Sequence, residues 1–452
     1  MHNQVKICAH SQIANIFNEY YIELPKRVIK DAGNRTFEPT YNKCQNSLFL
    51  PPTSPDGIMT IIYGLKNKTS AGLGDISNIL LRKIAHNIAI PLAHAINLSL
   101  ERGIFPDVLK PSKVIPLFKA GDTDDVSNFR PLTLSSNIAK IYEKVYFNAL
   151  NDFLAKNDII AKEQLGFQKG KSTNQAIAKA IEHITFNLNT NSKVIGLFID
   201  MSKAFDCVDH NKLLKILENY GIRGTALKWI ESYLADRKQC VELTNLVKDT
   251  YIKTWSSFLN IMYGVPQGSI LGPILFLLYI NELRFIIANK SKNCYPILYA
   301  DDNIIITGKS SDSTNELTED MLNEVISYLQ KLNLIVNTSK TSVMLFEARA
   351  GGYIPDVNVN GCRIPNVTTT KFLGVYIDSN LSWESHISEL CGKLRKNVFL
   401  LRQLSQTVDK TTLIQCYYAF INSILSSGNL VWGGAVASHI KKVFSLQKSA
   451  VR

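Results

Sequence analysis

The sequence lacks the cysteine spacing of a zinc-bound or disulfide-bonded small domain. Its eight cysteines are scattered through 452 residues, and no two of them are separated by only two residues. Zinc knuckles need such close pairs, and small secreted domains need a denser cysteine framework. The sequence therefore supports neither a zinc site nor a disulfide framework, and we expect reduced thiols.

A long uninterrupted hydrophobic segment is also missing. The N-terminus starts with polar residues and has no hydrophobic core of the signal-peptide type. The longest apolar run, residues 270–280, is interrupted by Gly272 and Pro273, and it is shorter than the roughly 20 residues of a membrane-spanning helix. We therefore expect an intracellular protein, nuclear or cytoplasmic, that is not secreted and has no membrane partner.

Acidic residues are in the minority. The chain has 50 Lys and Arg against 38 Asp and Glu, a net charge of +12. Such an excess favours a polyanionic partner such as nucleic acid, although a generic basic protein would share it. Half of the excess lies in residues 381–452, which hold nine basic and three acidic residues. This basic tail is the first candidate for a nucleic-acid contact.

Two short apolar runs adjoin aspartates. Residues 194–199 lead into Asp200, and residues 296–300 lead into Asp301 and Asp302, which a second apolar run follows. These runs predict buried strands, with the paired acids at the tip of a hairpin. If the strands are neighbours in one sheet, Asp200 and Asp301 can hold two divalent ions about 4 Å apart. Residues 299–302 alone would also fit a surface turn.

The acids belong to segments that resemble the motifs of a known polymerase family. Residues 198–210 resemble motif A, residues 264–273 motif B and residues 299–302 motif C of the reverse transcriptases of non-LTR (LINE-type, jockey-like) retrotransposons. Further similar segments lie at residues 128–132, 165–173, 334–341 and 371–378. The resemblance extends from about Ile13 to the C-terminus.

This resemblance implies an α/β (α+β) right-hand polymerase fold. The expected parts are fingers, a palm made of a ferredoxin-like antiparallel sheet with helices, and a partial helical thumb. We expect an N-terminal helix and extended arm in residues 1–57, fingers and palm in residues 58–380, and a basic, truncated thumb in residues 381–452. The local pattern of strand, helix, hairpin, helix and strand from residue 194 onward agrees with a palm.

The resemblance also implies a reaction and its cofactor. The family extends a DNA primer on an RNA template with dNTPs by two-metal nucleotidyl transfer. Asp200 and Asp301 are then the ligands of two Mg²⁺ ions, for which Mn²⁺ could substitute, and Asp302 supports the site at its edge. Lys340 matches the family's motif D lysine, which is placed to protonate the departing pyrophosphate.

Five further residues are expected to bind substrate. Phe205 occupies the position at which the family places an aromatic ring against the sugar, excluding a 2′-hydroxyl; otherwise it is a core residue. Gln267 would contact the nucleotide or template, and Gly268 would let the backbone approach it closely. Arg130 and Lys119 are candidates for the triphosphate, although solvent exposure is their plainer explanation.

In the basic tail, residues 387–401 have the apolar spacing of an amphipathic helix. Lys393, Lys396 and Arg402 lie off its apolar positions and are expected to bind duplex phosphates as part of the thumb. A solvated charged face is the alternative.

The chain departs from the family in three places. Residues 70–75 read Ser-Ala-Gly-Leu-Gly-Asp where the family commonly shows Ser-Ala-Gly-Pro-Asp-Gly, so we expect a different finger loop. No endonuclease precedes the polymerase segment and no Cys/His knuckle follows it. We therefore expect the nicking of target DNA to come from another chain or from a missing segment.

Two alternatives to the reverse transcriptase remain. One is a non-catalytic nucleic-acid-binding relic of such an element, against which the intact acids argue. The other is a related RNA-synthesising polymerase, which Phe205 disfavours, as does Ala300, where viral RNA polymerases usually carry glycine.

Overall fold

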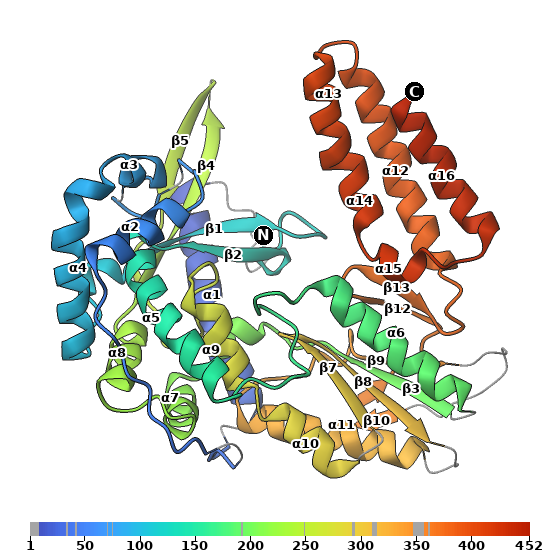
Figure 1. Cartoon of the computed structure of the whole chain (residues 1–452), viewed down its shortest axis with the longest axis horizontal. Coiled ribbons are helices and arrows are strands. Elements are labelled where there is room, and N and C mark those ends of the chain that lie inside the picture. Colours follow the sequence, from blue (N-terminus) through green and yellow to red (C-terminus); the bar gives the residue numbers. More distant parts are fainter. Residues whose placement is uncertain are drawn as a thin grey trace. The chain divides into compact units, whose positions relative to one another are not determined.

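The computed structural model describes residues 9–32, 35–40, 43–69, 71–74, 76–190, 193–247, 249–291, 294–309, 314–346, 357–359 and 362–452. The chain forms two compact units (Figure 1), which we call the first and the second unit. The first contains Met1–Ala161, Ser202–Glu282 and Tyr328–Ile335, and the second contains Lys162–Met201, Leu283–Ser327 and Val336–Arg452. The domain boundaries expected after residues 57 and 380 stay predictions. The two compact units are not the expected arm, fingers with palm, and thumb.

The first unit combines helices with a five-stranded sheet. Its strands are ordered β2-β1-β4-β5, and β6 pairs with β4. They are β1 (Ser112–Phe118), β2 (Phe129–Leu134), β4 (Lys238–Val247), β5 (Thr250–Trp255) and β6 (Leu259–Asn260). The helices are α1 (His10–Ala32), α2 (Pro55–Gly64), α3 (Asn78–Lys83), α4 (Ala85–Arg102), α5 (Asn137–Lys156), α7 (His210–Asn219), α8 (Gly224–Leu234) and α9 (Leu271–Tyr279). Helix α1 packs on the sheet, where its Phe17 joins Val114 and Val241 in a buried cluster.

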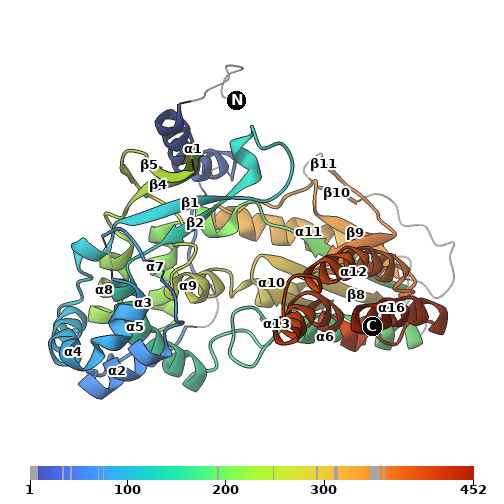
Figure 2. The same cartoon turned by 90° about the horizontal axis from the view of Figure 1, so that it is seen from above.

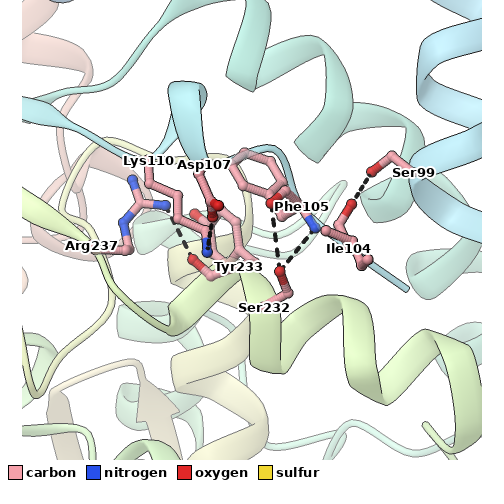
Figure 3. A network of polar contacts seen from close by, with 8 residues as sticks. All are labelled: Ser99, Ile104, Phe105, Asp107, Lys110, Ser232, Tyr233 and Arg237. Carbon is pink, nitrogen blue, oxygen red and sulfur yellow. Dashed lines mark hydrogen bonds and ion pairs between the residues drawn. The ribbon is translucent and has the colours of Figure 1, made fainter. Parts of the chain in front are cut away.

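A group of buried aromatic rings holds the turn after α4 against α8. The ring of Phe105 meets the rings of Trp229 and Tyr233 edge-on, with centroids 5.2 and 5.1 Å away. The backbone N–H of Phe105 donates to the Ser232 hydroxyl at 3.0 Å, and Arg237 Nη1 donates to the Tyr233 carbonyl at 3.2 Å (Figure 3). These contacts fix the chain just before β1 and β4 begin, and thus position the sheet.

A buried lysine joins three separate segments of the first unit. Lys212 on α7 is 8% exposed. Its ammonium donates to the carbonyl oxygens of Arg35 and Lys331 at 3.0 and 2.8 Å and to Asn333 Oδ1 at 2.7 Å. Burial lowers the pKa of Lys212. The lysine therefore ties α7, which follows the motif A segment, to residues 328–335.

The second unit is built on a four-stranded antiparallel sheet ordered β7-β8-β3-β9. Its strands are β3 (Lys193–Ile199), β7 (Cys294–Tyr299), β8 (Asp302–Lys309) and β9 (Ser342–Phe346). Two small hairpins follow, β10 (Val357–Val359) with β11 (Cys362–Ile364) and β12 (Thr369–Phe372) with β13 (Val375–Asp378). The buried strand before Asp200 and the hairpin around Asp301 are thus confirmed.

Helices complete the second unit. They are α6 (Thr173–Asn189), α10 (Leu283–Lys290), α12 (Glu384–Leu404), α13 (Lys410–Tyr417), α14 (Ser423–Ser426), α15 (Asn429–Trp432) and α16 (Ala437–Val451), and α11 (Thr314–Lys331) contributes to both units. One apolar cluster contains Ile177 of α6, Ile304 of β8 and Leu394 of α12. Helices α12 and α16 lie side by side (Figure 2). The amphipathic helix predicted in the basic tail is confirmed as α12.

Among the described residues, one segment, Leu271–Lys290, is long and apolar enough to cross a membrane. In the structure this segment comprises α9 and α10, and 72% of its most apolar stretch is buried inside the protein. Its hydrophobicity therefore matches that of core helices.

Candidate active site

The sheet of the second unit brings the predicted acids together at the ends of two neighbouring strands. Strand β3 pairs with β8 so that Ile199 lies opposite Asn303, and β7 pairs with β8 so that Tyr299 lies opposite Asp302. Continuing the first register by one residue places Asp200 opposite Asp302, with Asp301 beside them in the hairpin turn. The expectation that these strands are neighbours in one sheet is confirmed.

Hydrogen bonds from two directions hold the hairpin tip. Ala300 adopts a left-handed φ of +57°. Its N–H and that of Gly166 both donate to the side-chain oxygen of the buried Gln164, at 3.1 and 2.9 Å. From the other side, Asn303 Nδ2 donates to the carbonyl oxygens of Ala300 and Asp301 at 3.2 Å each. The position of Asp301 is therefore set by buried amides rather than by a loose turn.

Lys340 lies next to Asp200. Its ammonium is 3.7 Å from Asp200 Oδ2, with 56% of the lysine side chain and 31% of the aspartate side chain exposed. The backbone fixes this proximity, since the N–H of Asn337 donates to the Asp200 carbonyl at 2.8 Å. Asp301 is half-buried and Asp302 is exposed. The structure thus gathers all four predicted catalytic residues in the second unit.

The carboxylates at these strand ends suit a metal ion that is bound jointly by the protein and by its substrate. Within the described residues, no group of three or more His, Cys, Asp or Glu side chains could hold a metal ion by itself. Mg²⁺ prefers oxygen ligands and commonly uses one or two carboxylates together with substrate phosphates. Asp200 and Asp301 fit that requirement, and their role as metal ligands stays a prediction.

In the first unit, the motif A segment is joined to the motif B loop. The short helix η3 (Ala204–Cys207) carries Phe205, whose carbonyl accepts the N–H of Val265 at 2.9 Å. The Phe205 ring stacks on Phe276 of α9, with centroids 4.2 Å apart. Because both backbone and ring are fixed, Phe205 presents a rigid surface, as a steric gate requires. It is half-buried, so it is not a fully enclosed core residue.

Two glycines of the motif B loop make close backbone contacts inside the protein. Gly264 has φ +85°, and a Cβ there would lie 2.7 Å from the Asp206 carbonyl oxygen. Gly268 has φ +123°, and a Cβ there would lie 2.5 Å from the Thr133 carbonyl oxygen. The N–H of Thr133 donates to the Gln267 carbonyl at 3.0 Å. The glycines thus serve packing against η3 and β2, and the substrate approach expected at Gly268 stays a prediction.

The candidate phosphate-binding residues lie on the β1–β2 hairpin. Arg130 is exposed on β2, opposite Leu117 of β1. Lys119 is exposed just beyond β1, and its N–H donates to the Asn128 carbonyl at 2.9 Å. Strand β2 also carries Thr133, which contacts the motif B loop. Arg130 and Lys119 therefore belong to the same unit as Phe205, Gln267 and Gly268.

The charged residues of the predicted thumb lie on the exposed face of α12. Lys393, Lys396 and Arg402 are all exposed. Two of them have partners within the protein: Lys393 lies 3.4 Å from Glu389, and Arg402 donates to the Ser449 hydroxyl of α16 at 2.7 Å. An exposed i, i+4 ion pair is weak, so these charges can still meet phosphates.

Sequence reasoning missed two acidic residues beside the motif B segment. Asp206 accepts a hydrogen bond from Gln267 Nε2 at 2.7 Å, and burial raises the pKa of Asp206 to about 6. Glu143 on α5 is fully buried and accepts the N–H groups of Ile270 and Leu271 at 2.6 and 3.2 Å, where α9 begins. Asp206 could have been noticed directly after Phe205, whereas no sequence signal links Glu143 to residue 270.

The chain was compared with known proteins. Residues 117–377, more than half of the chain, match the family "Reverse transcriptase (RNA-dependent DNA polymerase)". The "Probable RNA-directed DNA polymerase from transposon BS" of Drosophila melanogaster is 26% identical over 426 residues, covering 90% of this chain and 45% of that protein. The "RNA-directed DNA polymerase from mobile element jockey" of the same organism is 27% identical over 416 residues, covering 90% and 44%. The chain thus spans less than half the length of these relatives.

A solved apo telomerase from Candida tropicalis is similar with a TM-score of 0.40 and 16% identity, covering 67% of this chain and 59% of that one. Residues 117–377, which match the family, include the three motif segments, the three carboxylates at the strand ends and Lys340. The chain therefore belongs to the reverse transcriptase family, as the resemblance of its motifs indicated.

Proposed function

We propose that this chain is an RNA-directed DNA polymerase of a non-LTR retroelement, which extends a DNA primer on an RNA template with dNTPs. The observation that carries the proposal is the strand register that aligns Asp200 with Asp302 and puts Asp301 in the adjoining turn. Members of the family carry acids at these motif positions, and reverse transcriptases generally depend on divalent metal ions. A plain surface hairpin would not need Gln164 and Asn303 to hold its tip.

In this proposal Asp200 and Asp301 hold two Mg²⁺ ions, or Mn²⁺ in their place. When bound, the ions activate the primer 3′-hydroxyl and spread the charge that develops at the α-phosphate. Asp302, exposed at the start of β8, adds negative potential at the edge of the site. Lys340 is held close to Asp200 and would donate a proton to the departing pyrophosphate, a contribution typically of about 10²–10⁴-fold.

The first unit would select and orient the nucleotide. Phe205, fixed by its stack on Phe276, would exclude a 2′-hydroxyl. Gln267 and Gly268 would contact the nucleotide or template from the motif B loop. Arg130 would bind the triphosphate through its planar guanidinium and Lys119 as a point charge. The nicking of target DNA would be supplied by another chain or another segment.

The two alternatives predict different products in one assay. Primer extension on an RNA template with dNTPs supports the reverse transcriptase. Extension only with rNTPs supports an RNA-synthesising polymerase, and nucleic-acid binding without extension supports a relic. The relic is disfavoured because the carboxylates, Gln267 and Lys340 are all in place.

The metal-ligand assignment can be tested by Asp301→Asn. This change removes a ligand and one of the neighbouring negative charges, so extension should fall by about 10³-fold or more while thermal stability holds or rises. Asp152→Asn, at an exposed position of α5, is the matched control and should change neither quantity. Unchanged primer extension by the purified Asp301→Asn variant would contradict the two-metal assignment.

The sugar gate can be tested by Phe205→Val. Loss of the ring opens space at the 2′ position, so the preference for dNTP over rNTP should fall by about 10–200-fold in kcat/KM, the range that steric discrimination supplies. Phe186→Val, at an exposed position of α6, should leave the preference unchanged. If the preference does not move in Phe205→Val, Phe205 is a packing residue and not a gate.

The thumb assignment can be tested through salt dependence. Affinity for an RNA–DNA duplex should fall linearly with salt on logarithmic axes, by about 0.7–0.9 per neutralised phosphate. Changing Lys393, Lys396 and Arg402 together to Gln should flatten that slope by roughly two to three units without changing sequence preference.

The control for this test alters the net charge equally at three exposed lysines of the first unit, Lys83, Lys156 and Lys228. Their change to Gln should leave most of the slope in place, since the effect depends on contact with phosphates. A thumb variant whose slope matches that of the parent would show that this face of α12 points to water.

A further inference from the structure

The first unit contains a pocket that no residue of the proposed metal site lines. Its walls include Tyr21 of α1, Asp206 of η3, Arg237 ahead of β4, and Gln267 of the motif B loop. Tyr21 is only 8% exposed, and its hydroxyl has no partner among the described residues. The side chains of Asp206 and Gln267 meet here through the 2.7 Å hydrogen bond from Nε2 to Oδ1. The pocket therefore encloses a specific polar pair.

The chemistry of this pair restricts the orientation of the Gln267 amide. A glutamine side chain has a donor end and an acceptor end that exchange places when the amide turns by 180°. An ionised carboxylate can only accept, so Asp206 selects the donor end of Gln267 and leaves its carbonyl oxygen directed elsewhere. A neutral partner such as Asn would accept either orientation. With Asp206 ionised, the side-chain carbonyl oxygen of Gln267 is therefore the atom left to accept a hydrogen bond from another group.

The backbone around the pair is rigid enough for this restriction to matter. The N–H of Gly264 donates to the Val208 carbonyl at 2.8 Å, and the N–H of Thr133 donates to the Gln267 carbonyl at 3.0 Å. Asp206 itself is held in η3, where its N–H donates to the Lys203 carbonyl at 3.0 Å. With both backbones fixed, the remaining freedom of Gln267 is in its side chain, which the Asp206 contact controls.

We propose that Asp206 is a positioning residue for nucleotide binding, which acts by holding the Gln267 amide in the single orientation that presents its carbonyl oxygen to a hydrogen-bond donor of the incoming nucleotide. The inference rests on the proposed function, because it requires Gln267 to contact the nucleotide. Asp206 itself touches no reacting atom in this account. It acts only through Gln267.

Protonation of Asp206 would release the restriction, since a neutral carboxyl can donate to the Gln267 carbonyl oxygen. The other titratable or charged groups facing Asp206 or the pocket are Tyr20, Tyr21, Lys203, Cys207, His210, Arg237 and Tyr263. Burial raises the pKa of Tyr21 and raises that of Cys207 to about 12, and it lowers the pKa of His210. Of these groups only His210 has an ordinary pKa close to that of Asp206.

The test compares the wild-type protein with Asp206→Asn, which keeps the side-chain volume. Two quantities are measured with a primer–template duplex: the equilibrium dissociation constant of a dNTP, by calorimetry in Ca²⁺ without turnover, and kcat and KM for single-nucleotide extension. For Asp206→Asn we expect the dissociation constant and KM to rise by about twofold or more, since an amide divided equally between two orientations halves the competent population, with kcat changed much less. In the wild type alone, KM should rise as the pH falls through about 6.

Two further variants separate positioning from structural support. Tyr21→Phe removes a polar group of the same pocket without touching the Gln267 contact, and it should leave the dNTP dissociation constant unchanged. The exchange Asp206→Asn with Gln267→Glu restores a charged hydrogen bond between the two positions but presents a carboxylate to the nucleotide. It should recover thermal stability without recovering dNTP affinity.

Several results would overturn the inference. An unchanged dNTP dissociation constant in Asp206→Asn would do so, as would an equal loss in Tyr21→Phe or recovery of affinity in the exchanged pair. A pH dependence that persists unchanged in Asp206→Asn would overturn the role of Asp206 protonation and assign the dependence to another group, such as His210 or the terminal phosphate of the dNTP. Wild-type protein that binds no dNTP at all would overturn the proposed function as well, so the two failures are distinguishable.

Discussion

The antiparallel pairing of β3 with β8 is the constraint on which the candidate active site depends. The pairing of β3 with β8 gathers Asp200, Asp301 and Asp302 at one end of a sheet whose interior is aliphatic. Acidic groups gathered in one place create a negative potential that favours cations. Lys340 at 3.7 Å from Asp200 supplies one positive charge. The buried amides of Gln164 and Asn303 fix the backbone of the hairpin tip that carries Asp301.

The predicted site residues are distributed over both units. The second unit holds the acids and Lys340, and the first holds Phe205, Gln267 and the β1–β2 hairpin with Lys119 and Arg130. The chain runs from Asp200 in one unit to Phe205 in the other within five residues. Motif A thus contributes a candidate metal ligand to one unit and a candidate sugar gate to the other. Membership of the reverse transcriptase family confirms the expected right-hand polymerase fold of mixed helices and sheet.

The parts predicted correctly are those that a local pattern determines. The apolar run before Asp200 and the two runs around Asp301 are short, continuous and buried, so their length and apolar composition identified β3, β7 and β8. Helix α12 was equally visible, because its apolar positions recur with helical spacing. The sheet of the first unit was not predicted. Its strand β5, Thr-Tyr-Ile-Lys-Thr-Trp, is exposed along most of its length and does not alternate regularly between polar and apolar residues, so it lacks the pattern of a half-buried strand.

Contacts between distant positions could not be inferred from the sequence. Asp206 and Gln267 are 61 residues apart, and Glu143 and Ile270 are 127 residues apart. Only the fold decides that a buried carboxylate meets the start of α9 or that a motif A acid selects the orientation of a motif B amide. The close packing of Gly264 against Asp206 has the same origin. Sequence motifs identify which residues are candidates for the chemistry, whereas such long-range hydrogen bonds determine how their side chains are oriented.

The central claim is that the acids at the ends of β3 and β8 bind divalent metal ions, and it is tested most directly by counting the bound ions. Free Mn²⁺ can be measured by electron paramagnetic resonance while it is titrated into protein saturated with primer–template and an unreactive deoxynucleoside triphosphate. The account predicts two Mn²⁺ per chain for the wild type. The Asp200→Asn/Asp301→Asn variant should show only the ion that the triphosphate carries by itself. An equal count with equal affinity in both proteins would contradict the account.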